Sequence, residues 1–314
     1  VGDRGKTNPN TGETVCGPET LTHAELLNNV EDIWRRVIDN EMITDWHMER
    51  TANLDLVDIP VLSAANWGGQ GLHTRGNFEG FVRSKSKQKW LEVHGGSHWA
   101  PFYTDYGIGI QKRFFDFFLK GKKNGWDKTP AVSLLVRSPG EKFVPRAEHE
   151  WPLKRTQWFD LYLDPRANTF CKKPISENAT ITYDMMGNGV TFAFPAQEQD
   201  VEITGPMALK LFVSSSTVDA DIFAIVRIFD PQGKEVLFVG ALDPKTPVAQ
   251  GWLRASHRKL DKKKSLPYRP WHTHDEKQPL TPGEIYELDV EIWPTCIVVP
   301  KGYSIALSIR GRDY

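Results

Sequence analysis

A histidine in a glycine-rich loop is the side chain best placed to do chemistry. His98 follows a Gly-Gly-Ser tripeptide, shortly after the mostly apolar run Lys89-Trp-Leu-Glu-Val that is typical of a buried strand. In α/β folds, catalytic groups stand at the carboxyl ends of the strands, where an imidazole can act as a general base and then as a general acid. His98 is therefore the candidate catalytic residue, with a loop histidine that only hydrogen-bonds its neighbours as the alternative. His94, at the end of the same run, is interpreted as structural.

Large aromatic side chains flank this histidine along the chain. Trp67 follows the preceding apolar run, and Trp99, Phe102 and Tyr103 follow His98. An aromatic wall suits an apolar or acyl group of a small molecule. We therefore predict that these side chains form the substrate pocket, with ordinary core packing as the alternative for each.

Other groups that could bind a metal or form disulfides give weaker patterns. His272-Thr-His274-Asp275 has metal-ligand residue types, but it lies in a Pro-rich loop without a third distant ligand. The cysteines at positions 16, 171 and 296 are far apart and odd in number, which suits a reducing compartment better than a disulfide framework. We expect no metal, no cofactor and a cytoplasmic location.

The elements that must position these residues follow three successive patterns. Residues 20–50 carry a helical signal, with Thr20 or Thr22 as N-cap and Glu25 completing a capping box. The apolar stripe from Leu26 to Ile38 predicts one amphipathic helix that packs on another element, and residues 43–48 show a second short helical pattern. Residues 59–65 and 89–93 read as buried strands, and residues 75–84 and 111–119 as helices, the last ending at Gly121. After Pro130 the pattern is all β, with strands predicted at 131–137, 157–163, 180–183, 190–194, 207–214, 222–229, 235–239, 252–257, 285–293 and 304–310.

Length and charge exclude several functional classes. The chain has 314 residues, with 39 Lys plus Arg against 40 Asp plus Glu, giving a formal net charge of −1. That balance argues against a protein that binds nucleic acid through bulk electrostatics. No apolar run approaches the length of a membrane span, so no membrane association is expected.

The order of these motifs resembles one family of α/β-hydrolases. Asn66-Trp-Gly-Gly69 after one strand, Gly96-Ser-His98 after the next, a Phe-rich helix and then a β region are similar to the cocaine esterase and X-prolyl dipeptidyl aminopeptidase group. The β region strengthens the resemblance through Ile203-Thr-Gly-Pro-Met-Ala-Leu-Lys-Leu-Phe-Val and Glu287-Leu-Asp-Val-Glu-Ile-Trp-Pro-Thr. The resemblance implies a serine hydrolase of esters, amides or peptides, with His98 as the base of a Ser-His-Asp triad.

The resemblance also implies a fold class and its domains. The chain would combine α/β and all-β parts, as the C-terminal portion of such a hydrolase. Residues 1–52 would be the end of a helical cap, and residues 53–128 the C-terminal part of the α/β-hydrolase sheet. Residues 129–314 would form a jelly-roll β-sandwich domain.

Two departures from the family pattern affect the triad. No Gly-x-Ser-x-Gly nucleophile elbow occurs in the sequence, so the serine is expected on a missing N-terminal half of the hydrolase domain, carried by the same chain before processing or by a companion chain. This chain alone would then be inactive. Gly69 stands where the family has its orienting Asp, which leaves Asp105, Glu79 or an acid on the missing segment as stand-ins.

A non-catalytic protein is the rival hypothesis. Gly69 would then mark a decayed triad, and the jelly roll would serve as a binding or assembly module. The sequence leaves open the substrate and whether the protein forms a homo-oligomer.

Overall fold

The computed structural model describes residues 7, 12, 22–241 and 243–314. The chain divides into two compact units, residues 1–50 and residues 51–314, and each is described by itself. Cys16 and Thr20 lie outside the described residues.

The first unit contains three short helices, α1 (His23–Asn28), α2 (Ile33–Asp39) and α3 (Asp45–Met48). The predicted capping box is confirmed, since the Thr22 amide donates to Glu25 Oε2 at 2.8 Å and the Glu25 amide to Thr22 Oγ1 at 3.3 Å. The prediction of one helix along the apolar stripe is wrong, because the Asp32 side chain accepts from the Arg35 amide and starts a new helix. No residue of α2 is buried, so the expected packing partner is not found among the described residues of this unit.

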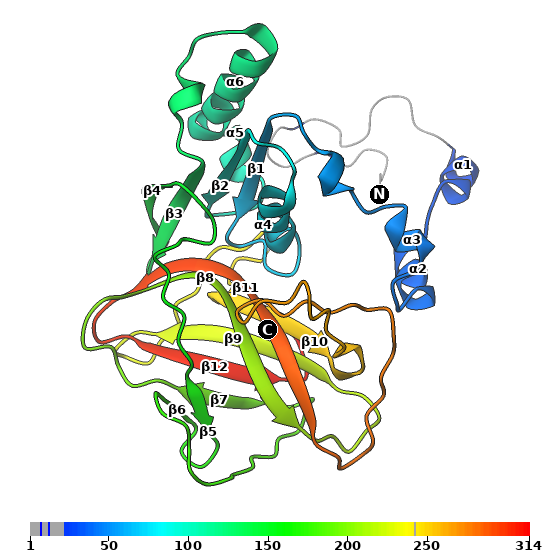
Figure 1. The fold of residues 1–314 in the computed structure, drawn as a ribbon, viewed down its shortest axis with the longest axis vertical. Coiled ribbons are helices and arrows are strands. Elements are labelled where there is room, and N and C mark those ends of the chain that lie inside the picture. The colour runs from blue at the N-terminus through cyan, green and yellow to red at the C-terminus, as the bar shows by residue number, and fades with distance from the viewer. Residues whose placement is uncertain (1–6, 8–11, 13–21, 242) are drawn as a thin grey trace. The chain divides into compact units, whose positions relative to one another are not determined.

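The second unit begins with a parallel three-strand segment, in the order β1-β2-β3 (Figure 1). Its strands are β1 (Val61–Asn66), β2 (Lys89–His94) and β3 (Val132–Ser138). The helical elements of this region are η1 (Leu54–Leu56), α4 (Thr74–Arg83), α5 (Ala100–Tyr103), α6 (Asp105–Lys120) and η2 (Trp126–Lys128). The predicted strand–helix alternation is therefore confirmed here.

Strand β2 presents different chemistry on its two faces. Leu91 and Val93 are buried in a core that includes Phe78 and Phe81 of α4. Trp90 points the other way and packs against Phe114 of α6, with ring centroids 6.2 Å apart. Alternate residues of a strand share a face, so Glu92 and His94 lie on the same side as Trp90.

Helix α6 has well-defined ends that fix the segment after β2. The Thr104 side chain accepts from the Gly107 amide at the N-terminus. At the other end Gly121 adopts φ 63°, the left-handed conformation of a C-cap, which confirms the prediction for this glycine.

The rest of the unit is mostly sheet, which confirms the β character predicted for this part of the chain. The sheet path continues β3-β11-β10-β9-β12-β7-β6-β5, with β4 on β3 and β8 on β11, and a C-terminal β-sandwich fits this arrangement (Figure 1). Ile222, Leu288 and Val290 are among the fully buried residues of its main core. The strands are β4 (Lys142–Glu148), β5 (Tyr162–Asp164), β6 (Thr169–Cys171), β7 (Val190–Ala193), β8 (Val201–Val213), β9 (Asp221–Phe229), β10 (Ala249–Arg254), β11 (Tyr286–Val299) and β12 (Ser304–Arg310), and η3 (Ala255–His257) follows β10.

Several strand predictions fail at the edges of this sheet. Residues 180–183 form no strand, and residues 235–239 make only isolated bridges. Strand β4, which contains Pro145, was not predicted. The structure accommodates Pro145 because β4 pairs with β3 alone, so an edge position tolerates the missing amide donor.

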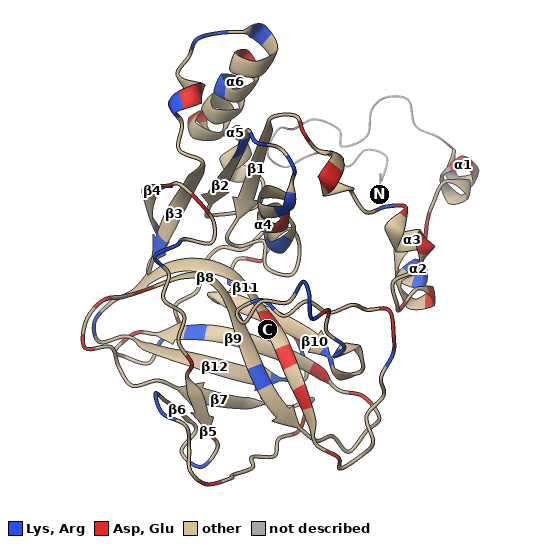
Figure 2. Cartoon of the chain, viewed as in Figure 1, with Lys and Arg blue, Asp and Glu red and all other residues tan. Residues whose placement is uncertain are grey.

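Charged residues mark the solvent-facing side of the long β8–β11 pair (Figure 2). Lys210 on β8 forms ion pairs with Glu287 and with Asp289 on β11, the latter at 2.9 Å. These side chains alternate with the buried Leu288 and Val290, as expected when one face of a strand pair packs on the core and the other meets water.

Candidate functional site

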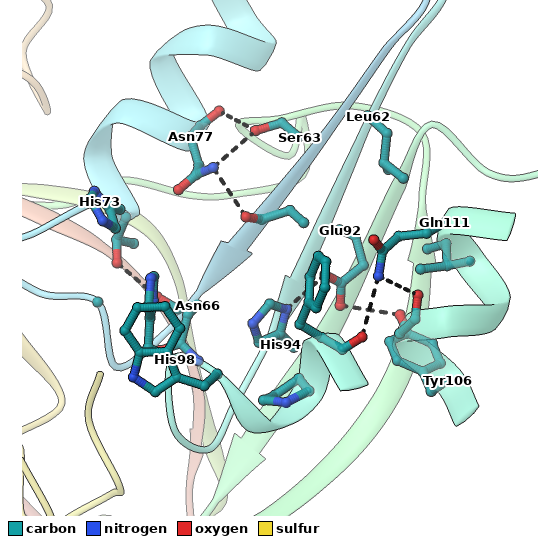
Figure 3. Close-up of a pocket in the computed structure, with 18 of the residues that line it drawn as sticks. Leu62, Ser63, Asn66, His73, Asn77, Glu92, His94, His98, Tyr106 and Gln111 are labelled. Carbon is teal, nitrogen blue, oxygen red and sulfur yellow. Dashed lines mark hydrogen bonds and ion pairs between the residues drawn. The ribbon is translucent and has the colours of Figure 1, made fainter. Parts of the chain in front are cut away.

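A cavity of about 780 Å³ opens at the carboxyl ends of β1 and β2 (Figure 3). The start of α4, the loop after β2, α5 and α6 complete its wall. Polar side chains at one end of the wall include Asn66, Glu92, His94 and His98. The cavity thus lies where sequence reasoning expects the chemistry of an α/β fold.

His98 lines this cavity from the loop after β2. Its ring lies between those of His73 and Trp99, with centroid distances of 5.1 Å and 4.7 Å. Nδ1 is buried and has no hydrogen-bond partner among the described residues. Burial, and then the positive charges of His73 and His94, lower the pKa of His98. The imidazole is therefore neutral near pH 7, which is the form that accepts a proton.

Asn66, at the end of β1, holds the loop that carries His98. Its Nδ2 donates to the carbonyl oxygens of Gly96 at 2.9 Å and Ser97 at 3.4 Å. Gly96 adopts φ 77°, a conformation that a glycine reaches without strain. The His98 amide donates to the Ala241 carbonyl at 3.2 Å. Backbone and side-chain bonds from distant segments thus hold the backbone of the loop that carries this imidazole.

Gly69 stands in the turn between β1 and α4, with no room for a side chain. A Cβ there would lie 2.7 Å from Thr74 Oγ1 and 3.2 Å from the Asn66 carbonyl oxygen. The Thr74 hydroxyl occupies this space because it donates to the same Asn66 carbonyl at 2.7 Å. The structure therefore explains physically why this turn carries glycine rather than a carboxylate.

The two acids predicted to replace the family's orienting Asp do not contact His98 in the part of the chain that the structure describes. Glu79 is buried on α4, where it contacts Arg269 and forms an ion pair with Arg83 at 3.9 Å. Asp105 lies in the first turn of α6 and is not part of the cavity wall. Neither residue has a contact with His98 among the described residues, so an orienting role for either stays a prediction.

The predicted aromatic pocket residues separate into two groups. Trp99, Phe102 and Tyr103 line the cavity and are more than half exposed. Trp67 does not line it: the ring is buried in the core against Phe78, and Nε1 donates to the Leu135 carbonyl at 2.8 Å. Trp67 continues the core-facing side of β1, which explains why it turns away from the cavity.

A buried glutamate beside a histidine is the feature that sequence reasoning missed. Glu92 is 3% exposed, and its Oε2 lies 2.8 Å from Nδ1 of His94. The Tyr106 hydroxyl donates to the other oxygen, Oε1, at 3.1 Å (Figure 3). Partial burial, and then the charge and hydrogen bond of Glu92, raise the pKa of Tyr106. The alternation of β2 was a usable signal, since it places residues 92 and 94 on one face.

Other candidate groups lie in the β region. His272 is largely buried, and its burial, followed by the charge of His274, lowers its pKa to about 4. Within the described residues, no group of three or more His, Cys, Asp or Glu side chains is arranged to hold a metal ion.

No helix in that same part of the chain is long and apolar enough to cross a membrane.

Comparison with known proteins gives matches to both parts of the second unit. Residues 124–314 match the family described as the X-Pro dipeptidyl-peptidase C-terminal non-catalytic domain. The crystal structure of a CocE/NonD family hydrolase from Staphylococcus aureus is 34% identical, with a TM-score of 0.88, and the match covers 91% of this chain and 52% of that chain. The cocaine esterase of Rhodococcus sp. (strain MB1 Bresler) is 24% identical over 254 residues, covering 68% of this chain and 40% of its own length.

A more distant structure shares the fold alone. The aminopeptidase from a marine sediment Thaumarchaeota archaeon is 12% identical, with a TM-score of 0.62, over 93% of this chain and 55% of that chain. The chain spans less than half the length of the curated relatives that it matches and about half the length of the solved structures.

Proposed function

The chain belongs to the family of the X-Pro dipeptidyl-peptidase C-terminal non-catalytic domain, and from this premise we propose that it is the C-terminal portion of a serine hydrolase. The matches confirm the resemblance to the cocaine esterase and X-prolyl dipeptidyl aminopeptidase group. The proposed reaction is cleavage of an ester, amide or peptide bond through an acyl-enzyme. The β region is proposed to be the jelly-roll domain, and residues 53–128 the C-terminal part of the α/β-hydrolase domain.

The observation that carries this proposal is the placement of His98. The imidazole lines a cavity at the carboxyl end of β2, held by a fixed loop and neutral near pH 7. In the proposed mechanism, it accepts the proton of a serine hydroxyl as the serine Oγ attacks the substrate carbonyl. It then gives this proton to the leaving group.

The serine is proposed to lie on a segment outside this chain, because the sequence contains no nucleophile elbow. The edge of β1 supports this arrangement. Strand β1 pairs with β2 alone, which leaves the backbone groups of its other edge without a strand partner among the described residues. An unpaired strand edge readily accepts another strand, so the remaining hydrolase strands are proposed to pair there.

The cavity wall supports a substrate with an apolar group. Trp99, Phe102, Tyr103, Phe114 and Phe115 contribute aromatic surface to the wall of the cavity that His98 also lines. Aromatic walls with a few convergent polar groups are typical of sites for small molecules. Esters with apolar acyl groups are therefore suitable first substrates.

The test uses the full polypeptide that contains this chain. We expect a fluorophosphonate probe to label one serine, and His98→Ala to lower kcat/KM for p-nitrophenyl butyrate by about four orders of magnitude. The exposed His149, just after β4, gives the matched control His149→Ala, which should keep wild-type activity. A folded protein that neither takes up the probe nor hydrolyses esters, amides or X-prolyl peptides would overturn the proposal.

Two observations favour the alternative of a non-catalytic protein. A side chain at Gly69, the position of the family's acid, would require Thr74 and the turn to move, and Nδ1 of His98 has no partner among the described residues. In that case, the β region would act as a binding or assembly module. The two proposals separate in the labelling experiment, because the alternative requires a folded protein without a labelled serine.

A further inference from the structure

Residues 238–241, here called the bridging segment, belong to the β region but bond to both turns beside the cavity. The Ala241 amide donates to the Gly68 carbonyl at 2.8 Å, and the Ala241 carbonyl accepts from the His98 amide at 3.2 Å. Gly68 lies in the turn after β1, and His98 lies in the loop after β2. A single residue of the domain described as non-catalytic therefore joins the two pieces of main chain that flank the proposed base.

Two glycines allow these segments to approach each other closely. A Cβ on Gly68 would lie 2.6 Å from Gly240 Cα and 2.7 Å from the Val239 carbonyl oxygen. A Cβ on Gly240 would in turn overlap the side chain of Thr246. Because the atoms that crowd Gly68 belong to the main chain, a side chain there could be accommodated only by moving the turn and the bridging segment apart. The contact between the two is thus built into the glycine positions.

The β region holds the bridging segment in place from its other side. Phe238 is 2% exposed in a core cluster of this region, and its amide donates to the Thr246 carbonyl at 3.0 Å. The next amide, that of Val239, donates to a carboxylate oxygen of Glu141, which lies in the turn between β3 and β4. A bond from a backbone amide to a charged acceptor is stronger than one to a neutral acceptor. Glu141 therefore fixes the main chain two residues before Ala241.

A residue close to Glu141 supports the same loop at a second point. Phe143 of β4 lies directly against Gly95, where a Cβ would overlap the aromatic ring. Phe143 also packs against the core cluster that contains Phe238. The loop that carries His98 thus rests on the β region at Gly95 and is bonded to it at His98.

We infer that Glu141 and Ala241 are positioning residues for His98, through which the β region fixes the main chain that carries the imidazole. The inference rests on the proposed function and gives the domain described as non-catalytic a part in the reaction. The imidazole must lie within hydrogen-bond distance of the serine hydroxyl, and a displacement of about 1 Å can lower a rate by about 100-fold.

The first test compares two substitutions of Glu141 in the full polypeptide. Glu141→Ala removes the acceptor of the Val239 amide, whereas Glu141→Gln keeps a side-chain oxygen that can accept it. With p-nitrophenyl butyrate, we expect Glu141→Ala to lower kcat by about 10-fold with little change in KM, because the substrate-binding wall is untouched. Glu141→Gln should keep a kcat close to that of wild type.

The second test moves the bridging segment directly. Gly68→Ala should lower kcat in the same way, because its Cβ requires the turn after β1 and the bridging segment to separate. Gly80→Ala is the matched control with the same added methyl group, and it should keep the wild-type kcat because nothing lies within 4 Å of its Cβ. The Glu141 pair decides the outcome even where Gly68→Ala does not fold.

The pKa of His98 provides a readout that a general loss of stability would not move. Burial, and then the charges of His73 and His94, lower this pKa in the folded protein. A loosened loop gives the ring more contact with water, so the pKa should rise toward its ordinary value of about 6.5. The pH dependence of carbethoxylation by diethyl pyrocarbonate, followed at His98 by peptide mass spectrometry, measures the midpoint. We expect a higher midpoint in Glu141→Ala than in wild type and in Glu141→Gln.

Two results would overturn the inference. One is a wild-type kcat and a wild-type His98 midpoint in Glu141→Ala and in folded Gly68→Ala. The other is a lower kcat with an unchanged midpoint, since the loss would then not arise at His98. Carbethoxylation needs no reactive serine, so a wild-type protein that takes up no fluorophosphonate defeats the proposed function, while the midpoints still test the contact with the β region.

Discussion

Gly69 lies in a turn where the Thr74 hydroxyl and the backbone of Asn66 occupy the space that a side chain at position 69 would need. A side chain there would displace Thr74 Oγ1 from its bond to the Asn66 carbonyl. Asn66 in turn holds the carbonyls of Gly96 and Ser97. A change at Gly69 is therefore expected to disturb the loop that carries His98, although the two segments are separate in sequence.

The substitution Gly69→Asp tests this crowding. We expect it to lower the free energy of unfolding by about 1–3 kcal/mol, because the overlap must be relieved by moving Thr74 and the turn. The variant should not gain hydrolase activity, although it restores the residue type of the family. Urea denaturation measures the first effect. Gly80→Ala in α4 is the control, since a Cβ there meets nothing within 4 Å, and it should raise stability by about 0.5–1 kcal/mol.

Single residues of the site were predictable to different degrees. His98, Trp99, Phe102 and Tyr103 line the cavity because residues that follow a parallel strand reach its carboxyl edge. Trp67 also follows a parallel strand, but it faces the core. Only the register of β1 determines whether a residue at this position faces the core or the cavity. The Glu92–His94 pair could have been predicted, because side chains alternate along a strand and residues 92 and 94 therefore share a face. Its burial could not be predicted, because that depends on where α6 lies.

At the scale of elements, β3 joins the two parts of the second unit. It runs parallel to β2 and also pairs with β11 through Arg137 and Ile297. Arg137 is fully buried at this junction, where it donates to the carbonyls of Cys296 at 3.3 Å and Val248 at 2.9 Å. The alternation of strand and helix in sequence predicted the parallel pairing of β1 with β2, whereas residues 131–137 were expected in the β region, so the parallel pairing of β3 with β2 was not predicted. The pairing with β11 involves residues far apart in the chain, which sequence periodicity does not encode.

The segment around η3 and the loop before β11 contains a cluster of one buried and two half-buried histidines that should respond to pH. Nδ1 of His257 lies 2.9 Å from Nδ1 of His274, and the ring centroids of His272 and His274 are 5.9 Å apart. Burial, and then neighbouring charge, lower the pKa values of both His272 and His274. These histidines therefore resist protonation in the folded state more than in the unfolded chain.

We expect stability to fall as the pH drops from about 6.5, where unfolded histidines titrate, to about 4, where His272 titrates in the folded protein. In this window the unfolded state binds more protons than the folded state, so acid favours unfolding. Urea denaturation at pH 7.5 and pH 5 measures the loss, which His272→Gln should reduce. An equal loss in wild type and His272→Gln would contradict the assignment to this residue.

At the scale of the whole molecule, the cavity exposes apolar surface that a larger assembly is expected to cover. Leu72, Trp99, Tyr103 and Phe115 are 49–71% exposed around it. A patch of this kind marks an interaction site or an aggregation liability in a folded protein. Within the proposed function, the remaining part of the hydrolase domain would pack here and beside β1.

The last prediction compares the 314-residue chain with the full polypeptide that contains it. Covering large apolar side chains contributes about 1.5–3 kcal/mol for each one that becomes fully buried, so several of them together amount to a large share of a domain's stability. We expect the chain alone to bind the dye ANS, to hydrolyse no ester and to melt at a lower temperature than the same residues within the full polypeptide. Fluorescence and calorimetry measure these differences. Equal melting temperatures without dye binding would mean that the exposed surface needs no cover, and the proposal of a missing half-domain at β1 would then lose its physical support.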